Sequence, residues 1–90
     1  TNDNPIEFIY PQQNSIISIP RGSDGNYQKV TFKVAHSGQT SKLFWYLDQK
    51  YLGSTKGNHQ KLLLPDSGEH QLHVVDGAGY HRKIEFYVKK

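Results

Sequence analysis

The chain has 90 residues, of which 34% are hydrophobic and 12% aromatic, and it contains neither Cys nor Met. This size allows one domain with a modest core, and the aromatic content is too high for a disordered segment. Its net charge of +3 is spread along the sequence, which argues against a nucleic-acid-binding surface, and the lack of Cys excludes disulfides and thiolate chemistry.

The absence of Met predicts that residues 1–90 are a single domain excised from a longer protein. No apolar stretch approaches the roughly 20 residues needed to span a bilayer. We therefore expect no direct membrane insertion of this fragment, and any membrane anchor would lie outside it.

The first predicted elements are two short strands, residues 6–10 and 15–19, which Pro11 separates. Proline cannot donate to a β-ladder, so its position favours an edge strand that switches from one sheet to the other. The next strand is predicted from the alternation of Phe32 and its apolar neighbours with polar residues, because a period of two indicates a half-buried strand.

The same alternation continues through the central run of the chain. It places Leu43, Trp45 and Leu47 inward, and Phe44 and Tyr46 outward. This run is the third main strand of the predicted sheet arrangement.

The segments after the central run begin with a tight hairpin at residues 48–50, and a turn is expected over residues 53–58. Leu62 lies four residues before Asp66, where an apolar side chain of the fifth strand would pack into the core. Two long alternating strands follow. Their inward residues are His70, Leu72 and Val74 on the first, and Ile84, Phe86 and Val88 on the second.

These elements predict an all-β fold, an immunoglobulin-like two-sheet antiparallel β-sandwich of about seven short strands. In such folds a Trp on the third strand packs across the core, and an Asp-x-Gly-x-Tyr-x-Cys string begins the sixth strand. Here His70 replaces the Tyr of this corner, and Leu72 replaces the Cys. Phe32 takes the place of the partner Cys by apolar packing, so the predicted structural core consists of Phe32, Trp45, His70 and Leu72.

Signals for catalysis and metal binding are weak. No Ser is followed three residues later by Lys, and no Gly-x-Ser-x-Gly string occurs, so we expect no catalytic residues. His70 and His73 are three residues apart on a strand and point to opposite faces, which predicts no metal site and no cofactor. His70 is then a corner residue whose ring nitrogen bonds the backbone. A zinc site that also draws on His36, His59 or His81 is the less favoured alternative.

The candidate binding surface follows from the outward residues. In this fold the third, sixth and seventh strands share a sheet, so His73 and Tyr87 would lie beside Phe44 and Tyr46 on its outer face. Exposed aromatic rings stack on sugars or anchor protein interfaces. The alternative is that these aromatic residues only favour strands and pair across them.

Two strings resemble a known family. Residues 44–53, Phe-Trp-Tyr-Leu-Asp-Gln-Lys-Tyr-Leu-Gly, and residues 65–79, Pro-Asp-Ser-Gly-Glu-His-Gln-Leu-His-Val-Val-Asp-Gly-Ala-Gly, resemble the C-terminal domain of bifunctional penicillin-binding proteins of the 1C type. That family carries a Trp-Tyr-Leu-Asp-Gly hairpin, a Pro-x-Gly-x-His-x-Leu corner and a Val-Val-Asp-x-x-Gly turn. Gln49 replaces the hairpin glycine, which favours a different turn.

The resemblance implies a non-catalytic, periplasmic module of a peptidoglycan glycosyltransferase and transpeptidase, whose two reactions would take place in upstream domains. Its expected partners are the upstream transpeptidase domain and either another envelope protein or peptidoglycan. The alternatives are a purely structural domain that stabilises the transpeptidase, or a glycan-binding immunoglobulin-like module of another secreted protein.

Overall fold

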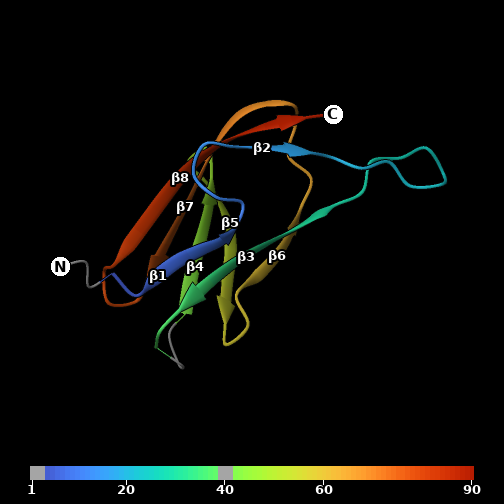
Figure 1. The fold of residues 1–90 in the computed structure, drawn as a ribbon. Helices are drawn as coiled ribbons and strands as arrows, with labels where there is room; N and C mark the ends of the chain where they lie inside the picture. Colours follow the sequence, from blue (N-terminus) through green and yellow to red (C-terminus); the bar gives the residue numbers. More distant parts are fainter. Residues whose placement is uncertain (1–3, 39–41) are drawn as a thin grey trace.

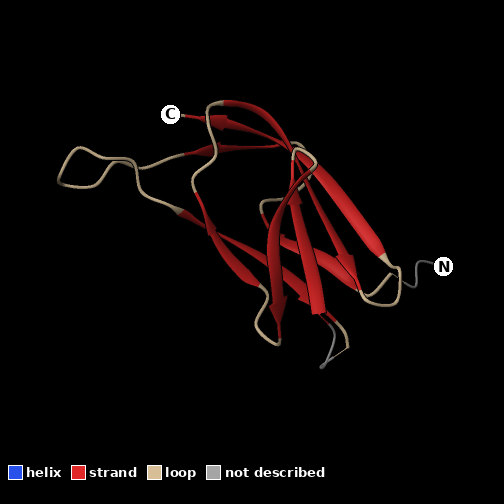
Figure 2. Cartoon of the chain, turned by 180° about the vertical axis from the view of Figure 1, so that it is seen from behind, coloured by secondary structure: helices blue, strands red, loops and turns tan. Residues whose placement is uncertain are grey.

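The computed structural model describes residues 4–38 and 42–90, which form two facing β-sheets joined by loops (Figures 1 and 2). The smaller sheet has the strand order β1-β3-β6, and the larger has the order β2-β8-β7-β4-β5. The predicted sandwich is confirmed, with eight strands in the described part rather than about seven. They are β1 (Ile6–Tyr10), β2 (Ser15–Ser18), β3 (Val30–His36), β4 (Lys42–Leu47), β5 (Lys50–Lys56), β6 (Gln60–Leu63), β7 (Gly68–Asp76) and β8 (His81–Lys89).

The chain changes sheets between β1 and β2. β1 pairs antiparallel with β3 at the edge of the smaller sheet, whereas β2 pairs with β8 at the edge of the larger one. The β2–β8 pair is parallel, an exception to the antiparallel arrangement expected from the sequence. Pro11, which follows a cis peptide bond, lies between the two strands. The prediction of an edge strand that switches sheets is therefore confirmed.

The core lies between the sheets and follows the period-two pattern of the strands. Phe32 of the smaller sheet and Trp45 and Leu72 of the larger sheet have no exposed surface. The Phe32 ring also meets the Phe86 ring edge-on, with ring centroids 5.5 Å apart. Burial of a large apolar side chain contributes about 1.5–3 kcal/mol. The other fully or largely buried apolar residues are Ile6, Phe8, Ile17, Ile19, Val34, Leu43, Val74, Ile84 and Val88.

Two consecutive hydrogen bonds inside this core satisfy the indole N–H of Trp45, the only Trp of the sequence. Trp45 Nε1 donates to Thr55 Oγ1 over 2.8 Å, and the same hydroxyl oxygen lies 2.8 Å from His59 Nδ1. His59 is buried, and this burial lowers its pKa. The neutral ring can thus accept the Thr55 hydroxyl proton, which ties β5 and the loop after it to the core.

Asp76 fixes the hairpin between β7 and β8. Its carboxylate accepts from the backbone N–H groups of Ala78 and Tyr80 and from His36 Nε2, each over 2.9 Å. Gly38 N donates to His36 Nδ1, so the ring hydrogen must be on Nε2. Burial opposes the charged carboxylate, but these hydrogen bonds outweigh it and lower the pKa of Asp76. Because His36 is on β3, the pair also links the two sheets.

The hairpin between β4 and β5 corrects one expectation. A different turn was expected because Gln49 replaces glycine, yet Asp48 and Gln49 have φ values of 51° and 70°. Two central residues with positive φ are what a type I′ turn requires, and this turn suits the twist of paired strands. Pairing of Leu47 with Lys50 closes a two-residue loop. The twist of the strands therefore sets the turn, at the cost of placing two non-glycine residues in the left-handed region.

Two other expectations are wrong. Leu62 is 62% exposed, because its pairing with Thr31 puts it on the outer face of the smaller sheet, and its neighbour Leu63 packs against the core instead. The turn expected over residues 53–58 starts later, since β5 continues to Lys56. A bulge next to Gly53, whose φ is 126°, lets the strand keep pairing with β4.

Candidate functional site: a row of aromatic rings

The outer face of the larger sheet carries a continuous row of rings across four neighbouring strands. Tyr46 on β4 is paired in register with Tyr51 on β5 and with His73 on β7. The Tyr46 ring centroid lies 5.3 Å from that of Tyr51 and 6.2 Å from that of His73. His81 on β8 continues the row, with its centroid 5.1 Å from His73. We call Tyr51, Tyr46, His73 and His81 the aromatic row.

The structure brings together only two of the four residues that the sequence predicts for the site. Tyr46 and His73 are neighbours in the row. Phe44 lies two residues from Tyr46 on β4, half-buried, with the Lys42 ammonium 5.8 Å from its ring centroid. Tyr87 lies on the same face but towards its β2 edge, where it pairs with Glu69 and Ile16. Tyr87 therefore belongs to a different part of the surface.

The other two members of the row, Tyr51 and His81, were missed from the sequence. A two-residue turn after Leu47 would place Tyr51 next to Tyr46. Because that turn contains no glycine, the sequence did not predict a two-residue turn and therefore did not predict this pairing. The position of His81 beside His73 depends on the length of the turn that Asp76 closes. That length sets the register of β8 against β7. The spacing of outward residues on one strand carries no signal for either contact.

Burial and neighbouring charges keep the centre of the row neutral. Burial lowers the pKa of His73, and the charges of His81 and Lys83 lower it further. Lys83 faces His73 because the two residues are paired between β7 and β8. At neutral pH His73 is therefore a neutral imidazole beside the ring of Tyr46, and rings with polar tips suit stacking and hydrogen bonding together.

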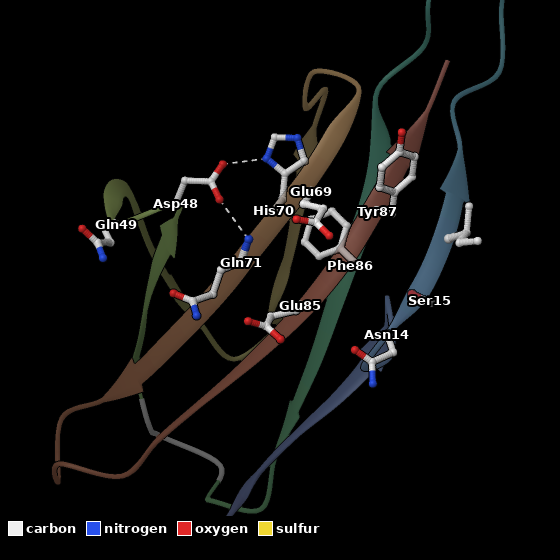
Figure 3. A pocket seen from close by; sticks show the side chains of 11 residues that line it. Asn14, Ser15, Asp48, Gln49, Glu69, His70, Gln71, Glu85, Phe86 and Tyr87 are labelled. Carbon is white, nitrogen blue, oxygen red and sulfur yellow. Dashed lines mark hydrogen bonds and ion pairs between the residues drawn. The ribbon is translucent and has the colours of Figure 1, made fainter.

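A shallow pocket of about 600 Å³ lies towards the other end of the same sheet (Figure 3). Ile16, which is 69% exposed, and Tyr87 provide apolar surface, and Glu69 and Glu85 provide carboxylates. Its remaining lining includes the β4–β5 turn. Its volume is within the usual range for ligand pockets, but it is open and largely polar, unlike a typical small-molecule site.

His70 borders this pocket, where Figure 3 shows its bond to Asp48, and it ties two turns together. Its Nδ1 lies 2.6 Å from Asp48 Oδ2 and its Nε2 lies 2.6 Å from the Asp66 carbonyl oxygen. Both partners are acceptors, so both ring nitrogens donate only when the ring is charged. Burial opposes that charge, but the hydrogen bonds and the negative charges of Asp48 and Asp66 outweigh it and raise the pKa of His70.

His70 is half-buried, whereas Phe32, Trp45 and Leu72 are completely buried. Its ring stacks on Phe86 with centroids 5.7 Å apart, on the core side of β7, and His73 lies on the opposite face. The bond to the Asp66 carbonyl does what a corner tyrosine hydroxyl does in immunoglobulin-like domains. The bond to Asp48 is an addition that a tyrosine could not make with one hydroxyl hydrogen.

One polar contact has the residue types of a possible catalytic pair. The Thr55–His59 contact resembles a nucleophile with its base, but its hydroxyl already accepts the Trp45 indole hydrogen and its histidine is buried. Within residues 4–38 and 42–90, no three His, Cys, Asp or Glu side chains gather closely enough to hold a metal ion together. In the same residues no helix is long and apolar enough to cross a membrane.

Comparisons with known proteins agree with the fold and identify the family. The model of the Penicillin-Binding Protein C-terminus Family matches residues 1–86. Among solved structures, a fibronectin(III)-like module of Clostridium thermocellum CbhA is similar, with a TM-score of 0.66 and 13% identity over 93% of this chain and 96% of that one. No curated protein matches the sequence. The structural likeness supports the sandwich fold alone.

Proposed function

The chain belongs to the penicillin-binding protein C-terminus family, and we propose that it is a non-catalytic accessory module of a penicillin-binding protein in cell-wall synthesis. On this proposal the parent protein polymerises and cross-links peptidoglycan with other domains in the periplasm. The module contacts peptidoglycan or another envelope protein through the aromatic row.

The observation that supports this role is the continuity of the row over four strands. Tyr51 at one end is 53% exposed, and His81 at the other end is exposed as well. Tyrosine rings bury much area on binding and lose little rotamer freedom, and their hydroxyls add directional hydrogen bonds. A row of such rings is therefore well suited to anchor a partner.

The tilt of the rings indicates the kind of surface that fits. Tyr46 is inclined by 51° to Tyr51 and by 40° to His73. Rings at these angles make an uneven surface, whereas a flat crystalline polymer needs coplanar rings. A protein surface, or a single peptidoglycan strand with its peptides, is also uneven and can be complementary in shape to such rings.

The test uses the full-length parent protein with Tyr46→Ser and Tyr51→Ser, separately and together. We expect reduced sedimentation with purified peptidoglycan or reduced pull-down of envelope proteins, with the thermal unfolding of the module little changed. Leu62→Ser is the matched control, because it removes an exposed apolar side chain from the other sheet. If all three variants bind like the parent in both assays, the row is not the contact surface.

A second candidate function is structural support of the adjacent transpeptidase domain. The smaller sheet favours it, since Ile9 on β1 and Leu62 on β6 are more than half exposed and Leu64 follows them at 40%. A neighbouring domain packed there would cover these apolar side chains. Ile9→Ser with Leu62→Ser would then lower the unfolding temperature of the transpeptidase domain in the parent, while the Tyr46 and Tyr51 variants would not.

A further inference from the structure

The two histidines at one end of the aromatic row lie close enough for one metal ion to contact both rings. His73 Nε2 lies 3.1 Å from His81 Nδ1, and the two ring planes are nearly perpendicular at 79°. The residues are diagonal neighbours on β7 and β8, because His73 pairs with Lys83 and His81 pairs with Val75. Both side chains therefore project from the same outer face.

The backbone that carries the two rings is well fixed. The β7–β8 ladder runs without a register shift from Gly68 to Val75. Asp76 then closes the hairpin with a buried carboxylate that accepts from two backbone N–H groups of the turn. Rigid placement matters because a site on paired strands needs little reorganisation when a ligand binds.

The observed separation is close to what one ion imposes on two imidazoles. Zn–N bonds of about 2.0–2.1 Å at a tetrahedral angle place the two nitrogens roughly 3.3 Å apart. In the absence of an ion, one of the nitrogens carries a hydrogen and donates to the other. Moving that hydrogen to the far nitrogen of its ring gives both facing nitrogens a free lone pair.

We propose that His73 and His81 form a surface binding site for one divalent transition-metal ion. The ion has two imidazole ligands from this chain and water in its other positions. Imidazole binds copper, nickel and zinc, and for a given set of ligands copper(II) binds most tightly. No third His, Cys, Asp or Glu of the described residues completes a set of three around an ion, so the affinity is modest. The site is additional to the proposed contact function and does not depend on it.

One neighbouring charge opposes the ion. Lys83 faces His73 across the β7–β8 ladder, and its ammonium group adds to burial and His81 in lowering the pKa of His73. The group that faces His73 from β4 is the ring of Tyr46. A positive side chain at this position favours the neutral ligand form of the imidazole but repels the metal ion. Removing the Lys83 charge should therefore change the metal affinity if the ion binds beside His73.

The test is isothermal titration calorimetry of the 90-residue chain with zinc chloride and with copper(II) chloride at neutral pH. His73→Gln and His81→Gln are each expected to weaken binding on the order of tenfold or more, since even the loss of an outer-shell partner costs that much. Lys83→Gln is expected to strengthen binding several-fold. Lys89→Gln is its matched control, because it removes the same charge from an exposed position elsewhere on β8.

NMR spectra of the histidine rings give a second readout that does not depend on the folding of variants. Copper(II) should broaden the ring signals of His73 and His81 before those of His36, His59 and His70. Equal affinity of the parent and both Gln variants overturns the proposal. So does a Lys83→Gln variant that binds no more tightly than Lys89→Gln, or copper broadening that begins at another histidine.

Discussion

Replacing His70 by Gln tests whether the charged His70 ring stabilises the corner that it forms with Asp48 and Asp66. The substitution removes two hydrogen bonds of 2.6 Å, one to the Asp48 carboxylate and one to the Asp66 carbonyl. Hydrogen bonds to charged groups contribute about 1.5–3 kcal/mol each, but the Asp48 side chain is 48% exposed and solvent screens its interaction. We therefore expect the free energy of unfolding to fall by about 2 kcal/mol at pH 6, or roughly 10 °C in Tm for a domain of this size.

The loss should depend on pH with a defined sign. The pKa of His70 is raised in the folded state, so its contribution to stability is complete below the unfolded value of about 6.5 and disappears as pH rises through the folded value. The difference between parent and His70→Gln should thus be largest at pH 6 and smaller at pH 9. Other titrating groups occur in both proteins, and their effects cancel in this difference.

Urea unfolding at the two pH values measures the effect, and NMR titration of the His70 ring gives its pKa independently. His73→Gln is the matched control, because the pKa of His73 is lowered and its contribution is lost as pH falls instead. An equal cost of His70→Gln at pH 6 and pH 9, or a His70 ring that titrates below 6.5, would refute the charged corner.

Three further predictions concern the core and the turns. Trp45→Ala should cost about 3–5 kcal/mol, most of the stability of a small domain, and a variant that melts like the parent would show that the core is misassigned. Gln49→Gly should raise Tm, because it relieves a left-handed non-glycine residue worth about 1 kcal/mol, and a lowered Tm would contradict the type I′ turn. Asp76 has a lowered pKa, so its contribution to stability is complete above about pH 3.8 and is lost as pH falls through the folded value. Asp76→Asn should therefore reduce the fall of Tm with decreasing pH, as measured in a series of thermal melts.

Sequence alternation predicted the strands of this fold well where one face is buried. In β3, β4, β7 and β8 a slip of one residue would turn every apolar side chain to solvent. The pattern therefore determines which side chains of each strand face the core. Leu62 shows the limit of this reasoning. Residues 62–64 are three consecutive leucines, which carry no alternation, and the pairing of Leu62 with Thr31 decides that Leu63 is the one that packs inward.

The candidate site was less predictable, because it depends on contacts between strands. The sequence determines that Tyr46 and His73 are on strands of one sheet, but their pairing depends on the register between β4 and β7. The His73–His81 contact also requires the turn after Asp76, whose buried carboxylate sets the length of the hairpin. Such a register follows from turn geometry and packing together, and neither appears in the spacing along a single strand.

The histidines of this domain divide according to the face on which they lie. On the core side of β7, His70 has an acceptor at each ring nitrogen and its pKa is raised. On the outer side, burial lowers the pKa of His73, and the neighbouring His81 and Lys83 lower it further. The positive charge is thus held at the corner near the pocket, while His73 in the aromatic row stays neutral and keeps a nitrogen lone pair. Both ring stacking and metal coordination at the row need that neutral state, so one strand separates a charge that stabilises the fold from rings that are available to bind.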